Sequence, residues 1–170
     1  MWKRRISTVL MILIFFLLQT TVFQRTLRLA GIAPNLLLIL TVCIGYMRGR
    51  TEGLIVGLIC GLMMDMMYGV VVGPCGFIYM ALGFLVGYCQ KYYFREDFII
   101  PTILVSASEL IFELYYYFVE FLLRGRLNFG FYLLYIILPK VIYTVAMSLI
   151  LYRLLRTLEK WLTPKNRREA

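Results

Sequence analysis

The chain has 170 residues, of which 62% are hydrophobic and only 16% carry a charge, and its mean hydropathy is +0.82. These values exclude an ordinary water-soluble domain, and the length leaves room for about six membrane spans of roughly 20 residues and for no separate soluble domain. The net charge of +9 does not indicate nucleic-acid binding, because the basic residues flank apolar runs and form no face of their own.

The first expected span covers residues 6–23 and follows three basic residues near the N-terminus. A basic start followed by an apolar run is also typical of a secretory signal peptide. No cleavage site with small residues follows the run, however. We therefore expect this segment to remain in place as the first membrane span.

The second apolar segment, residues 33–47, is short, and a segment of this length can also form a re-entrant hairpin. Pro34 suits the first turn of a helix, where a backbone N–H would be unpaired in any case. A re-entrant segment would place the basic N-terminus and the basic C-terminal tail on opposite sides of the membrane. We therefore expect a complete crossing.

The third span, residues 53–72, carries a small or acidic residue at every fourth position. These residues are Gly53, Gly57, Gly61, Asp65 and Gly69. Residues at this spacing share one helix face, and small residues let another helix approach closely. An acid on that face must point at protein or at a water-filled cavity. The face therefore predicts a helix contact, either within the chain or with another protein.

A tight GPCG turn leads into the fourth span, residues 75–90. Gly83 and Gly87 repeat the four-residue spacing there and could form the other half of an internal contact. The fifth span covers residues 98–123, and the sixth, residues 131–152, contains Pro139, which we expect to kink the helix.

The C-terminal segment, residues 153–170, alternates basic and apolar residues and predicts an amphipathic stretch on the membrane surface. With six crossings, most of the basic residues lie on the side of the two chain ends. The positive-inside rule then predicts that both ends are cytoplasmic. The turn formed by Arg48, Arg50 and Glu52 lies on the same side, as a topology signal or as a contact for a cytoplasmic partner.

Four ionisable residues lie deep in the expected spans: Asp65, Glu109, Glu113 and Lys140. Exposing them to lipid would be costly, so we expect them to face the protein interior. Glu113 and Lys140 come to similar depths in adjacent spans, which predicts an ion pair. The four groups could fix the register of the helices, form an ion path, or hydrogen-bond a helix of a partner protein.

Catalytic and cofactor-binding patterns are missing from the sequence. The chain has no histidine and no GxSxG or HExxH motif, and its four cysteines form no CxxC pair. The nearest approach to a catalytic pair would be Lys140 with Ser106 or Ser108. We therefore expect neither an enzyme nor a bound metal or cofactor.

The run RG…EG…G…G…D…G, from Arg48 to Gly69, lies between PNLLLIL and LGFLVGY, and together they resemble the MreD family of rod shape-determining proteins. The length, the six spans and the basic ends agree with this resemblance. One departure is Asn35, because the family pattern usually has Asp after the proline.

The resemblance implies a non-enzymatic subunit of the bacterial plasma membrane that associates with MreC. With MreC, it would connect the actin-like MreB to peptidoglycan synthesis by RodA and a class B penicillin-binding protein. The fold it implies is an all-α bundle of six transmembrane helices, similar to the substrate-binding subunits of energy-coupling-factor transporters. A small-molecule-binding subunit of such a transporter is the alternative, although the short GPCG and RLNFG loops offer little to build a pocket.

Overall fold

The computed structural model describes residues 2–23, 32–69, 72–89, 99–124, 130 and 133–162. Within these residues the fold is helical, as the sequence predicts. The elements are α1 (Trp2–Leu17) with the π-helical turn η1 (Leu18–Phe23), α2 (Leu36–Arg48), α3 (Arg50–Tyr68), α4 (Pro74–Cys89), α5 (Ile99–Arg124), and the π-helical turn η2 (Leu133–Ile137) with α7 (Leu138–Leu162).

Four of the described helical segments are long and apolar enough to cross a membrane. They are Arg5–Phe23, Arg50–Tyr68, Ile99–Val119 and Leu133–Glu159. The other two helices, α2 and α4, are apolar but shorter, with 13 and 16 residues. At 1.5 Å per residue α2 is only about 20 Å long, which is less than the roughly 30 Å of a bilayer core.

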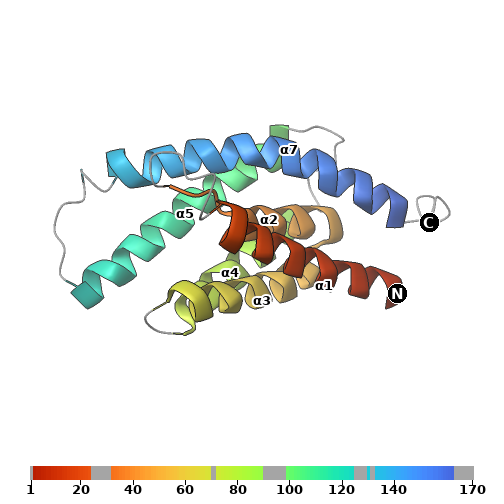
Figure 1. Ribbon diagram of the computed structural model, residues 1–170, viewed down its shortest axis with the longest axis horizontal. Coiled ribbons are helices and arrows are strands. Elements are labelled where there is room, and N and C mark those ends of the chain that lie inside the picture. The colour runs from red at the N-terminus through yellow and green to blue at the C-terminus, as the bar shows by residue number, and fades with distance from the viewer. Residues whose placement is uncertain are drawn as a thin grey trace.

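The short helix α2 lies at the centre of the bundle (Figure 1) and contacts α1, α3, α4, α5 and α7. Every residue from Leu36 to Tyr46 is buried. A helix that is apolar on all sides can be surrounded by protein as well as by lipid, and the unbroken run LLLIL at its start suits either environment. The second apolar segment is therefore the core of the fold, with the longer helices packed around it.

The helix α2 runs in the same direction as α7 and is held to it near both ends. At its start, the backbone N–H of Asn35 donates to Thr144 Oγ1 at 3.3 Å. At its end, Arg48 Nη2 lies 2.6 Å from Glu159 Oε2. The start of α1 lies at this second end as well, because Arg48 also donates to Thr8 Oγ1. The beginning of α1 and the end of α7 thus share one end of the bundle (Figure 1).

A single residue, Gly49, joins α2 to α3. Its φ of 96° lies in the left-handed region that side chains other than glycine rarely adopt. This conformation lets the chain reverse between two helices without a longer loop. Gly49, the glycine of the RGRTE motif, is therefore needed for the backbone conformation of the turn between α2 and α3.

The last helix extends beyond the end of the expected sixth span. Pro139 is the second residue of α7, which follows directly after the π-helical turn η2, so it lies within a continuous helical segment, where its missing backbone N–H removes one donor from the helix. The helix then continues to Leu162 without a break at residue 152. The first part of the segment that we expected to lie on the membrane surface thus extends α7, and residues 163–170 lie outside the described residues.

Candidate functional site

The glycines of α3 pack directly against the backbone of α4. A Cβ atom placed on Gly57 would lie 2.3 Å from the carbonyl oxygen of Tyr79, and one on Gly61 would lie 2.4 Å from that of Cys75. Such distances are far below a van der Waals contact, so only glycine allows this approach. The other close contacts of this kind involve Gly53, Gly83 and Gly87, and Gly45 of α2 likewise lies close to Gly83.

The spacing of these glycines thus serves a contact inside the chain, between the two arms of the α3–α4 hairpin. Gly69 stands apart from the others because it caps the C-terminus of α3, where its N–H donates to the backbone oxygen of Asp65 at 2.9 Å.

Asp65 is 1% exposed and uses both carboxylate oxygens to cap α4. Its Oδ2 accepts from the backbone N–H groups of Gly73 and Gly76, each at 2.9 Å, and its Oδ1 accepts from that of Cys75 at 3.1 Å. The first N–H groups of a helix have no partner within the helix and favour a negative charge nearby. In the structure the Asp65 carboxylate thus serves a contact within the chain, between the end of α3 and the start of α4.

Glu113 on α5 and Lys140 on α7 form the ion pair that their depths in the sequence predict. The Glu113 side chain is 2% exposed and that of Lys140 is 24% exposed. Lys140 Nζ also lies 5.6 Å from the centre of the Phe112 ring, close enough for a cation–π interaction. Both side chains lose most of their contact with solvent. Removing only one of them would therefore leave a buried charge without its partner, which strongly destabilises a protein.

Glu109 lies one helical turn before Glu113 and is fully buried. Its Oε1 accepts a long hydrogen bond of 3.4 Å from Thr144 Oγ1. Its Oε2 has no hydrogen-bond partner among the described residues. Glu109 therefore belongs to a second polar contact between α5 and α7, next to the ion pair.

Asn35 extends this polar region to α2 and α4. Its Oδ1 accepts from the Leu38 backbone N–H at 3.3 Å, which caps α2, and from the Tyr79 hydroxyl at 2.6 Å. Its Nδ2 has no partner within the described part of the chain. Gln19 lies beside it and accepts the backbone N–H of Leu37 through Oε1 at 3.0 Å.

Sequence reasoning missed Gln19, Asn35, Tyr79 and Thr144 as members of one polar cluster. Asn35 carried a usable signal, because Asn directly before an apolar run is typical of a helix N-cap. The other three are single polar residues in apolar segments, and nothing in their spacing shows that they meet.

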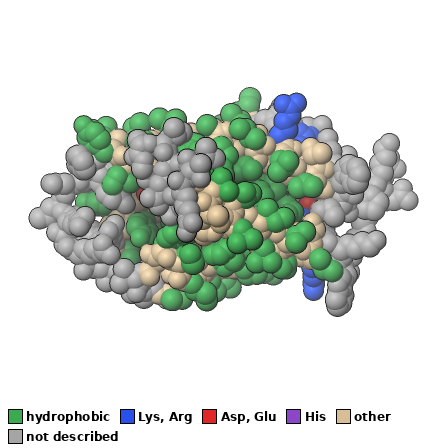
Figure 2. Space-filling view, viewed as in Figure 1, with side chains coloured by type: hydrophobic (Ala, Val, Ile, Leu, Met, Phe, Trp, Pro, Cys, Tyr) green, Lys and Arg blue, Asp and Glu red, His purple; other side chains and the backbone are tan. Residues whose placement is uncertain are grey.

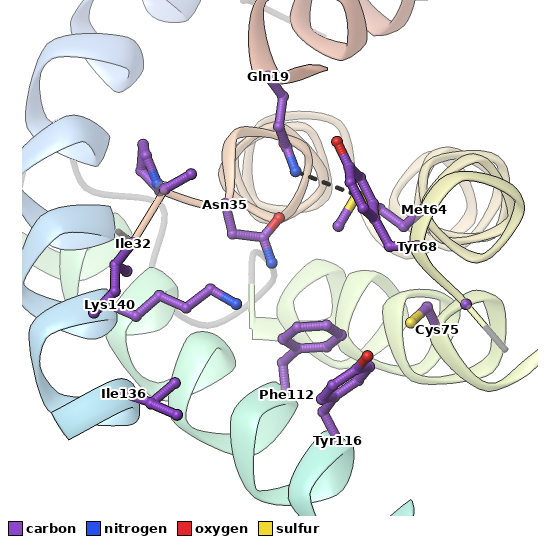
Figure 3. A pocket seen from close by; sticks show the side chains of 13 residues that line it. Gln19, Ile32, Asn35, Met64, Tyr68, Cys75, Phe112, Tyr116, Ile136 and Lys140 are labelled. Atoms are coloured by element: carbon purple, nitrogen blue, oxygen red, sulfur yellow. Dashed lines mark hydrogen bonds between the residues drawn. The ribbon is translucent and has the colours of Figure 1, made fainter. Parts of the chain in front are cut away.

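A cavity of about 320 Å³ lies beside this cluster (Figure 3). Its polar lining comes from Gln19, Asn35, Tyr68, Tyr116 and Lys140, and its apolar lining includes Ile32, Ala33, Pro34, Met64, Phe112 and Ile136. In Figure 3 the side chains of Asn35, Lys140 and Phe112 converge on one space from three different segments. This is the size of a small-molecule site.

At the other end of the bundle, Arg48 is the centre of an ionic cluster. Its guanidinium contacts Glu159 at 2.6 Å and Glu52 at 3.3 Å, while its side chain is 1% exposed. Arg50 is exposed instead. Of the charged residues in this turn, Arg48 and Glu52 thus take part in the fold, and Arg50 lies at the surface.

The outer surface is mostly apolar. Figure 2 shows hydrophobic side chains over the middle of the visible face, with the visible basic side chains toward the end that holds the start of α1. In the described part of the chain, no group of three or more His, Cys, Asp or Glu side chains is placed to hold a metal ion. The arrangement is that of a bundle in which Asp65, Glu109, Glu113 and Lys140 point into the protein, while large apolar side chains cover much of the outer surface.

Comparison with known proteins agrees with this architecture. The model of the family described as rod shape-determining protein MreD matches residues 3–161, which is nearly the whole chain. No curated protein and no solved structure gives a match. The apolar helices and the extent of the match lead to one conclusion: the chain belongs to the MreD family of rod shape-determining proteins, and it is a multi-pass membrane protein.

Proposed function

We propose that this protein is a non-enzymatic scaffold of the cell-elongation complex. It binds the transmembrane helix of MreC and couples MreB filaments to peptidoglycan synthesis by RodA and a class B penicillin-binding protein. Membership of the MreD family supports this role. The transporter alternative has no such support and is not proposed.

The proposal rests on one observation: the charged groups deep in the spans are paired within the chain, so the outer surface at that level is apolar. Asp65, Glu113 and Lys140 all find partners within the chain. Large apolar side chains such as Leu10, Phe84 and Ile103 point outward. A partner helix would therefore pack against an apolar outer surface, by shape and close contact.

A scan of the outer surface tests this contact with MreC. One large outward-facing residue on each of four helices is changed to Trp, and MreC is measured by co-purification with the tagged protein from its native membrane. The four substitutions are Leu10→Trp, Phe84→Trp, Ile103→Trp and Ile150→Trp. We expect one face to lose MreC while the other variants retain it. Absence of MreC from the unaltered protein, or its retention by all four variants, would contradict the proposal.

We propose that the exposed Arg50 side chain contacts a cytoplasmic partner, with MreB as the first candidate. Arg48 and Glu52 are held within the fold, so Arg50 is the group of this turn that presents its charge outward. Arg50→Glu should reduce the sedimentation of the protein, in vesicles, with MreB filaments. Arg153→Glu, which makes the same charge change at an exposed residue of α7, is the matched control. Equal effects of both variants would indicate net charge alone.

The proposal requires both chain ends to be cytoplasmic. The start of α1 and the end of α7 share one end of the bundle, and basic residues surround them. Reporter enzymes that are active only in the periplasm, fused to either end, should remain inactive. Activity at one end alone would contradict the six-crossing arrangement.

A further inference from the structure

Two buried carboxyl groups share a single cation where α5 meets α7. Glu109 and Glu113 lie one helical turn apart on α5 and are 0% and 1% exposed. Lys140 of α7 forms an ion pair with Glu113 and also interacts electrostatically with Glu109. If all three groups carried their usual charges, this cluster would hold one unbalanced negative charge inside the bundle.

The other groups that face the cluster do not balance this charge. Thr144 of α7 and Asn35, which caps α2, are the uncharged polar side chains beside the Glu109 carboxyl group. The titratable groups that α3 and α4 bring near the cluster are Asp65, Cys75 and Tyr79. Each of these groups is either neutral or negative. Among the described residues, Lys140 is therefore the one positive charge at this level of the bundle.

The start of α4 does not supply the missing positive charge either. Its free N–H groups are the nearest helix N-terminus, and such groups favour an anion. They are already bound to the carboxylate of Asp65, however, through the N–H groups of Gly73, Cys75 and Gly76. The two glutamates are thus left with Lys140 alone.

A bound proton removes the excess charge without any further ligand. An unbalanced charge is costly inside a membrane protein, and a buried carboxyl group commonly avoids this cost by taking up a proton. Where two carboxyl groups lie this close, such a proton belongs to the pair and not to one residue. With one proton the cluster is neutral, because Lys140 balances one carboxyl group and the proton balances the other.

The cavity gives this proton a route to water. Lys140 lines the cavity of about 320 Å³, and its side chain is 24% exposed. Figure 3 shows the Lys140 amine pointing into the same space as the Asn35 side chain. The cluster is therefore buried in the bundle but connected to solvent on one side, so that a proton can enter and leave.

We propose that Glu109, Glu113 and Lys140 form a proton-binding site that holds one exchangeable proton at neutral pH and thereby stabilises the contact between α5 and α7. A glutamate in the unfolded chain is ionised at neutral pH. The folded protein then binds one proton more than the unfolded chain. Its stability should therefore fall as the pH rises, until the proton is lost from the folded state.

Infrared spectroscopy detects this proton directly, because a protonated carboxyl group has a C=O stretching band that a carboxylate lacks. Spectra and thermal unfolding midpoints of the full chain in detergent are recorded from about pH 5 to about pH 9, a range in which ordinary Asp and Glu side chains are ionised. We expect the band at neutral pH and its loss toward the alkaline end. The unfolding midpoint should fall over the same range.

Variants that keep the size of the side chain assign the proton. Glu109→Gln leaves a neutral pair of Glu113 and Lys140, so the band and the fall of the midpoint with pH should both disappear. Glu113→Gln should have the same effect, because Glu109 then pairs with Lys140, and it provides a second test if the first variant does not fold. Glu52→Gln, the same change in the ionic cluster around Arg48, is the control and should keep both signals.

Three results would overturn the proposal. The first is the absence of the band from the unaltered protein at neutral pH, which would mean that both glutamates are ionised. The second is a band that survives both Glu109→Gln and Glu113→Gln, because the proton would then lie on another group. The third is loss of the band in Glu52→Gln.

Discussion

Arg48 and Glu159 are separated by 111 positions in the sequence, yet the Nη2 and Oε2 atoms of their side chains lie 2.6 Å apart. The Nε atom of Arg48 donates to the same oxygen at 3.0 Å. This contact joins the end of the central helix α2 to the last turns of α7. It thus fixes one end of the bundle, the end at which the chain begins. Loss of this contact should weaken the packing of α1, α2 and α7 against one another.

We predict that Arg48→Met lowers the free energy of unfolding by on the order of 2–4 kcal/mol, because it removes the partner of Glu159 and of Glu52 from a largely buried cluster. A double-mutant cycle with Glu159→Gln, read from thermal unfolding in detergent, measures the coupling. Additive effects of the two changes would show that the contact contributes little.

Asp65→Leu should destabilise the protein by about 1–3 kcal/mol, because three backbone N–H groups at the start of α4 lose their acceptor. Asp65→Asn retains one carbonyl oxygen and should cost less. Met66→Leu changes the exposed neighbour on the same helix and serves as the control. If Asp65→Leu has the same thermal unfolding midpoint as the control, the carboxylate does not stabilise the start of α4.

Gly57→Ala should disrupt the α3–α4 contact, because the new methyl group would meet the Tyr79 backbone at 2.3 Å. Overpacking of this kind typically costs about 1–3 kcal/mol. Gly130→Ala is the control, since a Cβ there has no described residue within 4 Å. Thermal unfolding midpoints of the two variants provide the comparison, and equal midpoints would count against tight packing at Gly57.

Removing one member of the Glu113–Lys140 pair should destabilise the protein more than removing both. Lys140→Met leaves a buried carboxylate without its cation, at a cost of about 3–5 kcal/mol. The double variant Glu113→Gln, Lys140→Met removes both charges and should recover much of this loss. Detergent melting curves of the two single variants and the double variant test the order. A double variant that is less stable than either single one would contradict it.

The sequence predicts the helices and part of their packing, because both depend on short repeating patterns. Four-residue spacing places Gly53, Gly57 and Gly61 on one face, and the hairpin made by the GPCG turn brings Gly83 opposite them. The depths of Glu113 and Lys140 in consecutive spans are enough to pair them.

The rest depends on how distant segments meet. Asp65 reaches the N–H groups of α4 only because the chain turns back at Gly73, and the sequence shows an acid among glycines without showing that it faces its own hairpin. The cavity requires Gln19, Asn35 and Lys140 to converge from three helical segments, and no local pattern encodes that. The short length of the second apolar segment allows a re-entrant hairpin as well as a crossing. That protein surrounds this helix on all sides is visible only in the folded bundle.

The glycine contact between α3 and α4 has a mechanical consequence. The two backbones touch over about three turns and leave no layer of side chains between them, so these helices should move as one rigid unit. Gly45 brings the backbone of α2 close to both helices as well. Any shape change transmitted across the membrane would then have to occur as a movement of α2, α3 and α4 together relative to α5 and α7.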